Sequence, residues 1–196
     1  IQEYQEIISV NFMENMMDTP HFVEIDKENG YWFVTLINSG NVVMYDLNNN
    51  QKLGELLVGD SPALMVHDSE QQRLYVSRMM PMNGMMGMPE ADSNKIQVLD
   101  YSFGTLISLT EFNLPGPAPH GLDLSDDGSY LYVASVTTDW IFKINTQTGE
   151  ISNSMNLLDP DLEMPQEETE TNYYKPIQLK YFNERVFITC SAGKFY

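Results

Sequence analysis

The stretch PHGLDLSDDGSYLYVASVTTDWIFKINTQTGEIS, from Pro119 to Ser152, decides the fold. Short runs of apolar, aromatic and β-branched residues alternate in it with polar turns at 125–129 and 147–149. Alternating apolar positions are typical of half-buried β-strands, and turns rich in Gly, Asn and Asp between such runs indicate antiparallel hairpins. The stretch therefore predicts one sheet of four short antiparallel strands, joined in chain order by turns.

Three other parts of the chain follow the same order. Each opens with a proline before a short apolar strand, at Pro20, Pro62 and Pro176. Pro20 and Pro62 are 42 residues apart, and the two later intervals are 57 residues each. A four-stranded unit that recurs roughly every 40 to 45 residues is typical of a β-propeller blade. No stretch shows a convincing helical periodicity, so the sequence predicts an all-β protein, a β-propeller of four-stranded antiparallel blades.

The extra residues of the two longer units fall in loops, which repeat proteins tolerate well. A methionine-rich insertion at 79–94 separates the second and third strands of one unit, and an acidic loop at 159–174 follows the last strand of the next. The predicted complete blades are residues 20–60, 61–118 and 119–175.

The two ends of the sequence predict incomplete blades. Residues 1–19 look like the outer strand of a preceding blade and a linker, and residues 176–196 hold two strands, the first half of a further blade. Propellers close a ring of about four to eight blades, which leaves few strand edges exposed. We therefore expect an incomplete portion of a longer ring, which further residues or other subunits complete.

The third unit resembles the YVTN-type β-propeller repeat. The resemblance lies in the opening Pro119-His120-Gly121, the turn at 126–128, the strand that contains Tyr132 and Val133, and the turn at 146–149. It extends over residues 20–193 and is weakest in the last unit, whose turn lacks a glycine. It implies a propeller of secreted, periplasmic or surface proteins of prokaryotes. Relatives include lactonase-like enzymes and the propeller domains of nitrous-oxide and nitrite reductases, so the resemblance implies the fold more than the function.

Composition excludes several classes of function. The 196 residues carry a formal net charge of −18, which repels phosphate backbones and excludes nucleic acid as a partner. No apolar run approaches the roughly 20 residues of a membrane-spanning helix, so no membrane-spanning segment is predicted. The single cysteine, Cys190, excludes an intrachain disulfide, and its strand position predicts a buried thiol. Trp32 and Trp140 are expected to pack between neighbouring sheets.

Two histidines occupy the same position in two units. His21 and His120 directly follow the opening proline, where the other units have Ala63 and Ile177. Equivalent positions of different blades form a ring at one mouth of the channel, where neutral imidazoles could bind a metal ion. The resemblance to reductase propellers, whose copper is held by histidines there, makes copper the candidate. The alternative is that each histidine bonds to a backbone carbonyl. We expect rings from non-adjacent blades to lie too far apart to share an ion without further ligands.

The methionine-rich insertion admits three interpretations. Its methionines are Met79, Met80, Met82, Met85, Met86 and Met88. Thioethers are soft ligands that select Cu(I), but methionine also makes a flexible apolar contact surface, and a loop without a role is the third alternative. We expect a docking surface for a protein partner or for other subunits.

Other candidate sites carry weaker signals. The acidic residues of the loop at 159–174 could offer oxygen ligands to Ca²⁺, but they lack the spacing of a calcium-binding loop, so a solvated charge run is expected. His67 is predicted to be a packed histidine. No nucleophile elbow, Cys/His pairing or phosphate-binding loop is present.

The sequence thus predicts a binding or scaffolding propeller outside the cytoplasm, and no residue is assigned a catalytic role. A copper-binding or redox-associated propeller is the main alternative, and lactonase-like hydrolysis is a third. The identity of the ligand, and the activity of a longer protein, stay open.

Overall fold

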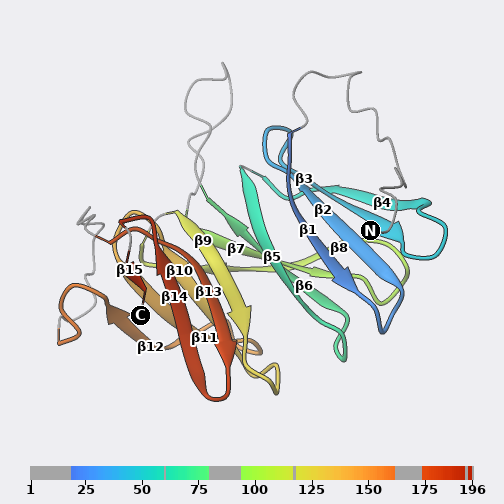
Figure 1. Ribbon diagram of the computed structural model, residues 1–196. Helices are drawn as coiled ribbons and strands as arrows, with labels where there is room; N and C mark the ends of the chain where they lie inside the picture. The colour runs from blue at the N-terminus through green and yellow to red at the C-terminus, as the bar shows by residue number, and fades with distance from the viewer. Residues whose placement is uncertain are drawn as a thin grey trace, which may run out of the picture.

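The computed structural model describes residues 19–59, 61–79, 94–116, 118–161, 174–192 and 194–195. Within these ranges every regular element is a β-strand, and no helix is present. The strands form four antiparallel sheets in which strand order equals chain order (Figure 1). Three sheets have four strands and the last has three, so the prediction of an all-β fold built of four-stranded blades is confirmed.

The strands of the first two blades are β1 (Pro20–Asp26), β2 (Tyr31–Leu36), β3 (Asn41–Asp46), β4 (Lys52–Leu57), β5 (Pro62–Asp68), β6 (Arg73–Arg78), β7 (Lys95–Asp100) and β8 (Ile107–Asn113). The strands of the third and fourth are β9 (Pro119–Leu124), β10 (Tyr130–Ser135), β11 (Trp140–Asn145), β12 (Ile151–Asn156), β13 (Pro176–Phe182), β14 (Arg185–Cys190) and β15 (Lys194–Phe195). The two-residue strand β15 pairs with β14, beyond the two strands expected in the last unit.

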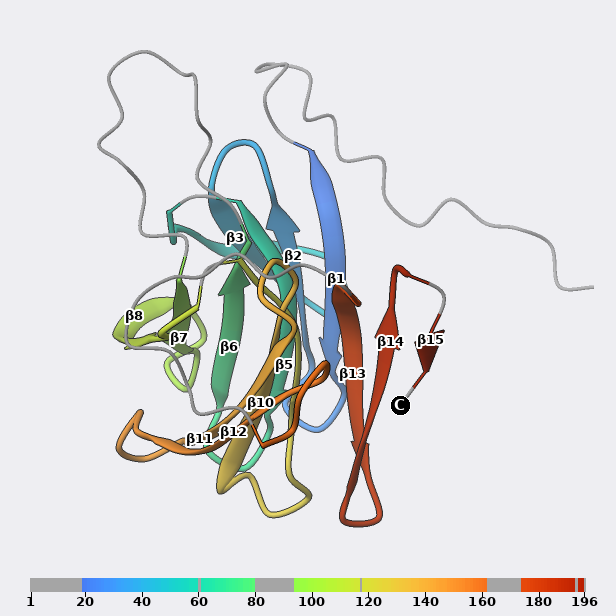
Figure 2. The ribbon, with the colours of Figure 1, turned by 90° about the vertical axis from the view of Figure 1, so that its left-hand side faces the viewer.

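The first strands of successive blades contact one another at the centre of the molecule. Strand β5 contacts β1 on one side and β9 on the other, and β9 contacts β13. Figure 1 shows the four sheets following one another as blades, and Figure 2 shows β1, β5 and β13 running along a common direction. We call β1, β5, β9 and β13 the inner strands.

Apolar clusters hold each blade against the next, because both faces of an inner sheet must be buried. Phe33 and Met44 of the first blade pack with Leu74 and Leu99 of the second. The largest cluster joins the second and third blades and includes the fully buried Trp140, as expected for that residue. A smaller cluster joins the third and fourth sheets, and its members include Leu179, Ile188 and Cys190. The prediction of a buried Cys190 is therefore confirmed.

Trp32 packs differently from Trp140. Its ring stacks on Tyr45, with the ring centroids 4.2 Å apart, on the face of the first blade that does not contact the second. Its cluster consists of residues of the first blade alone, so the described residues do not place it between two sheets as the sequence had suggested.

The turn expected at 126–128 forms as predicted. Gly128 has a φ of +67°, a left-handed conformation that costs glycine little and other residues more. A side chain there would also meet the carboxylate of Asp68, because a Cβ atom would lie 2.7 Å from its Oδ2. The glycine thus allows both the hairpin and the close contact with the second blade.

Candidate functional site

A β-bulge follows the opening proline of each inner strand. In the first blade the register shifts between Pro20 and Phe22, so His21 is the extra residue. Shifts at the same place occur in the other three blades. The equivalent residues there are Ala63, His120 and Ile177. A bulge bends the strand and turns its side chain to a new direction, so this position is set apart from the regular alternation of the sheet.

His21 and His120 meet at the centre although their blades are not adjacent. Their ring centroids lie 6.1 Å apart, with the planes at 72° in a T-shaped contact. The expectation that the rings lie far apart was wrong, because β1 and β9 both flank β5 and their bulges bring the two side chains together. Two metal–nitrogen bonds of about 2 Å each could bridge rings at such a separation.

His120 has a fixed hydrogen-bonding state. Its Nδ1 donates to the carbonyl oxygen of Ile177 in the fourth blade, 2.7 Å away. A carbonyl only accepts, so Nδ1 carries the hydrogen and Nε2 keeps a lone pair in the neutral ring. Burial lowers the pKa of His120, the bond to Ile177 opposes this, and His21 lowers it further, so the pKa lies below its ordinary 6.5. The backbone bond expected as an alternative to metal binding is present, and the same bond orients many metal-binding histidines.

The pair offers two metal ligands and no more among the described residues. No group of three or more His, Cys, Asp or Glu side chains surrounds a common point in that part of the chain. Two neutral imidazoles suit a soft or borderline ion of low coordination number, such as Cu(I), better than Ca²⁺, which takes six to eight oxygen ligands.

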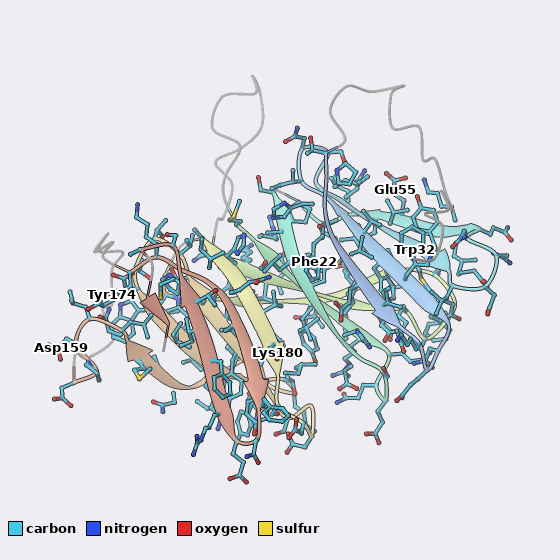
Figure 3. All side chains as sticks on the ribbon, viewed as in Figure 1. Phe22, Trp32, Glu55, Asp159, Tyr174 and Lys180 are labelled. Atoms are coloured by element: carbon cyan, nitrogen blue, oxygen red, sulfur yellow. The ribbon has the colours of Figure 1, made fainter. Side chains whose placement is uncertain are left out.

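A groove with a volume of about 280 Å³ lies where the inner strands converge. All four of them line it, through Glu24 of β1, Val66 of β5, Leu122 of β9 and Lys180 of β13. Figure 3 labels Phe22 of β1, a further lining residue, and Lys180 of β13, both toward the middle of the view. The groove therefore combines an apolar floor with charged groups from opposite ends of the described chain.

Glu24, the carboxylate that lines the groove, forms a hydrogen bond with His67 of the next blade. His67 Nδ1 lies 2.6 Å from Glu24 Oε1, and its Nε2 lies 3.9 Å from Asp26 Oδ1. Burial lowers the pKa of His67, but the hydrogen bond and negative charge of Glu24 outweigh it, and Asp26 and Asp68 add to them, so the pKa is raised above 6.5. The predicted packed histidine is thus largely buried, with 19% of its side chain exposed, and it joins the first blade to the second.

Asp26 lies next to His67 and is fully buried. Its carboxylate accepts hydrogen bonds from Tyr101 Oη at 2.8 Å, Ser69 Oγ at 3.0 Å and Asn29 Nδ2 at 2.7 Å. Burial raises the pKa of Asp26, but these hydrogen bonds, first from Asn29 and then from Tyr101, outweigh it and leave the pKa below its ordinary value. A buried carboxylate is stable only with such donors, so this cluster fixes the junction of the first two blades.

The basic side of the groove has a similar anchor. Lys180 Nζ donates to Asp123 Oδ1 at 2.9 Å, and the backbone N–H of Tyr181 donates to Asp123 Oδ2 at 2.6 Å. The Asp123 side chain is 6% exposed and that of Lys180 is 75% exposed. Asp123 of the third blade thus holds the ammonium group of Lys180 in place, while most of the lysine side chain still faces solvent.

The predicted methionine surface falls largely outside the described residues. Met79 is half-buried and directly follows β6. The remaining methionines of the insertion, Met80, Met82, Met85, Met86 and Met88, lie outside the described part. Of the acidic loop, Asp159 and Asp161 are described and exposed, and its glutamates are not among the described residues. The copper, docking and calcium interpretations of these loops stay predictions.

Sequence reasoning did not single out Glu24, Asp123 or Lys180. Each is one polar residue in a short strand, and nothing in the sequence links the three. One signal was present, since Glu24 and Asp26 alternate with exposed apolar residues on a strand that enters a blade. An inner strand with carboxylates on its inward side indicates a polar channel wall rather than a closed core.

The fold is that of known β-propellers. Hydrazine synthase from Kuenenia stuttgartiensis matches with a TM-score of 0.66 and 19% identity, over 92% of this chain and 44% of that one. A streptogramin B lyase matches with a TM-score of 0.63 and 16% identity, over 92% of this chain and 55% of that one. A periplasmic gluconolactonase from Pseudomonas aeruginosa, PpgL, matches with a TM-score of 0.56 and 16% identity, over 71% of this chain and 39% of that one.

These likenesses establish the propeller class. The chain spans about half the length, or less, of these three structures. No protein-family model and no curated protein matches the sequence. The YVTN-type assignment therefore stays a prediction. In the described ranges, no helix is long and apolar enough to cross a membrane.

Proposed function

We propose that this chain is a β-propeller module that binds a small ligand in the groove between its inner strands. The observation that carries the proposal is the lining of the groove, to which all four inner strands contribute. Binding sites are concave, mostly apolar and equipped with a few polar groups that orient the ligand. Glu24 and Lys180 supply such groups here, and each is held in place by a partner on a neighbouring blade.

A ligand screen with a blocked variant tests this proposal. The purified protein is screened by thermal shift against cationic, anionic, zwitterionic and neutral small molecules. Gln178→Trp places a large ring at the exposed lining of the groove, and Thr110→Trp places the same ring on an exposed strand away from it. Ligands are expected to raise the Tm of the wild type and of Thr110→Trp but not of Gln178→Trp. A shift that persists in Gln178→Trp, or no shift with any class, contradicts the proposal.

The second candidate function is copper binding by His21 and His120. It is favoured by the 6.1 Å separation of the rings and by the free Nε2 that the Ile177 bond leaves on His120. Together these features place two imidazoles close enough to bind one ion at one end of the inner strands.

Copper binding is tested by titration of Cu(I) against a chromogenic competitor. His21→Ala and His120→Ala are each expected to weaken binding roughly tenfold or more, since even the loss of an outer-shell partner of a metal ligand typically costs about 10–100-fold in affinity. His67→Gln removes a histidine that is paired with Glu24 and serves as the control. Unchanged binding in the His21→Ala/His120→Ala double variant would assign the ion elsewhere, with the methionine insertion as the next candidate.

The remaining predictions about location and partners extend this proposal. A place outside the cytoplasm is supported by the YVTN-type resemblance and by the structural likeness to a periplasmic gluconolactonase. A longer ring is supported by the share of the matched structures that the chain covers.

Docking through the methionine insertion is tested by deletion of residues 80–88, which should disrupt an assembly and leave the Tm unchanged. Lactone hydrolysis has no residue in the described part that we assign to it.

A further inference from the structure

The charged groups of the groove indicate the class of ligand, an inference that rests on the proposed function. The groove presents one carboxylate from the first blade and one ammonium from the fourth, at Glu24 and Lys180. These strands are the first and the last of the four inner strands. The two charges therefore enter the groove from different blades and are not paired with each other, since each has its own partner elsewhere.

Glu24 keeps the capacity to bind a cation. Its Oε1 accepts from His67, and its Oε2 has no hydrogen-bond partner among the described residues. A carboxylate accepts through both oxygens, so one is available for an ammonium group in the groove. The side chain is 20% exposed, so a pair formed there is partly shielded from water and stronger than one on the surface.

Lys180 keeps the capacity to bind an anion. An ammonium group has three hydrogens, and Asp123 takes one of them. Both oxygens of Asp123 are already engaged, by Lys180 and by the Tyr181 N–H, so this carboxylate is not a free competitor for a ligand cation. Gln178 and Thr189 face each other across β13 and β14 and also line the groove, where they offer an amide and a hydroxyl beside the ammonium.

Apolar side chains fill the lining between these polar groups. The buried apolar part consists of Leu64, Met65, Val66, Leu122 and Leu179, and Phe22 and Phe187 are the lining residues with aromatic rings. An aliphatic or aromatic ligand group placed against them leaves water, which contributes favourably in proportion to its apolar area. A volume of about 280 Å³ admits a small molecule only.

We propose that the groove binds a small zwitterion with an apolar body, namely an apolar amino acid or a short apolar peptide with free termini. The ligand ammonium group pairs with Glu24, the ligand carboxylate pairs with Lys180 and the donors beside it, and the side chain packs on the apolar floor. Because His67 and the ligand ammonium group both pair with Glu24, binding strengthens as His67 loses its proton.

Calorimetric titration at about pH 7, where an α-amino group with a pKa of about 7.7–8.0 is largely protonated, tests the proposal with four probes. L-Leucine and leucyl-leucine carry both charges, leucinamide carries the ammonium alone, and N-acetyl-leucine carries the carboxylate alone. We expect at least one zwitterion to bind roughly tenfold or more tightly than either singly charged probe, as loss of a charged hydrogen bond implies. The two zwitterions distinguish an amino acid from a peptide.

Charge-removing variants locate the two ends of the ligand. Glu24→Gln is expected to abolish the advantage of leucine or leucyl-leucine over N-acetyl-leucine, and Lys180→Met to abolish its advantage over leucinamide. Glu55→Gln and Lys52→Met remove the same charges from a pair on the outer strand β4 and should leave binding unchanged.

Two results overturn the inference. Either no zwitterion binds at millimolar concentration, or binding is unaffected by both groove variants. If a singly charged or neutral compound then binds the wild type and fails to bind Gln178→Trp, the groove is still a ligand site and only the zwitterion class is wrong. If no compound of any class binds, the proposed function fails with it.

Discussion

Glu24 and His67 form a hydrogen bond of 2.6 Å that joins the inner strands of two adjacent blades. The two residues are 43 positions apart in the chain, and Glu24 also lines the central groove. The contact thus belongs both to the junction of the blades and to the candidate site.

This pair predicts a pH-dependent stability. The pKa of His67 is raised above its ordinary 6.5, so the folded protein holds the proton more tightly than the unfolded chain. The stabilisation is therefore fully present below pH 6.5 and is lost as the pH rises through the folded-state pKa. We expect the free energy of unfolding, from urea titrations, to fall by about 1 kcal/mol over this upper range. His67→Gln should lack this fall, and parallel profiles for the two proteins would contradict the assignment.

His120 predicts the opposite displacement of pKa. Its ring is buried and its Nδ1–H is held by the Ile177 carbonyl, so the neutral form is favoured. In ¹⁵N-correlated NMR spectra we expect His120 to titrate below 6.5, with the hydrogen on Nδ1 in the neutral state, and His67 to titrate above 6.5. A neutral His120 with its hydrogen on Nε2 would be incompatible with the bond to Ile177 and would weaken the copper proposal.

Substitution of Tyr101 tests how much a hydrogen bond to the buried Asp26 carboxylate contributes to the free energy of unfolding. Tyr101→Phe removes the hydroxyl that donates to Asp26 Oδ2 at 2.8 Å and leaves a fully buried carboxylate with fewer donors. We expect a loss of about 1–3 kcal/mol in the free energy of unfolding, measured by chemical denaturation. Tyr31→Phe is the matched control, because the Tyr31 ring packs on that of Tyr101 and its hydroxyl has no hydrogen-bond partner among the described residues. Equal losses in both variants would assign the effect to ring packing.

Gly121 predicts how closely the third and fourth blades approach. A Cβ atom there would lie 2.7 Å from the carbonyl oxygen of Ile177 and 2.8 Å from the Cα of Gln178, and neither backbone atom can rotate away. Gly121→Ala should cost about 1–3 kcal/mol, as other overpacking changes do, and should speed amide exchange in β13. Gly30→Ala adds strain at a φ of +78° but meets nothing closer than 3.8 Å, so it should leave exchange in β13 unchanged. Unchanged exchange in both variants would show that the blade can shift without cost.

Much of the fold could be predicted because strands and turns leave a local pattern. The strand at 130–135 and the turn at 126–128 were predicted where they occur, since alternation and turn residues depend on a few neighbours. Strand β15 was not predicted, because two residues are too few to show an alternation. The equivalence of His21 and His120 was also visible, since both directly follow an opening proline.

The sequence by itself determined the class of fold, the inner strands and the pair of histidines at their start. Only the tertiary structure decided that these histidines touch, that His67 pairs with Glu24, and that Lys180 reaches the same groove from the last sheet. The physical reason is that these contacts join residues far apart in the sequence. Periodicity reports which face of a strand is buried, whereas these contacts depend on the bulges and on the angles at which successive blades pack around a common centre.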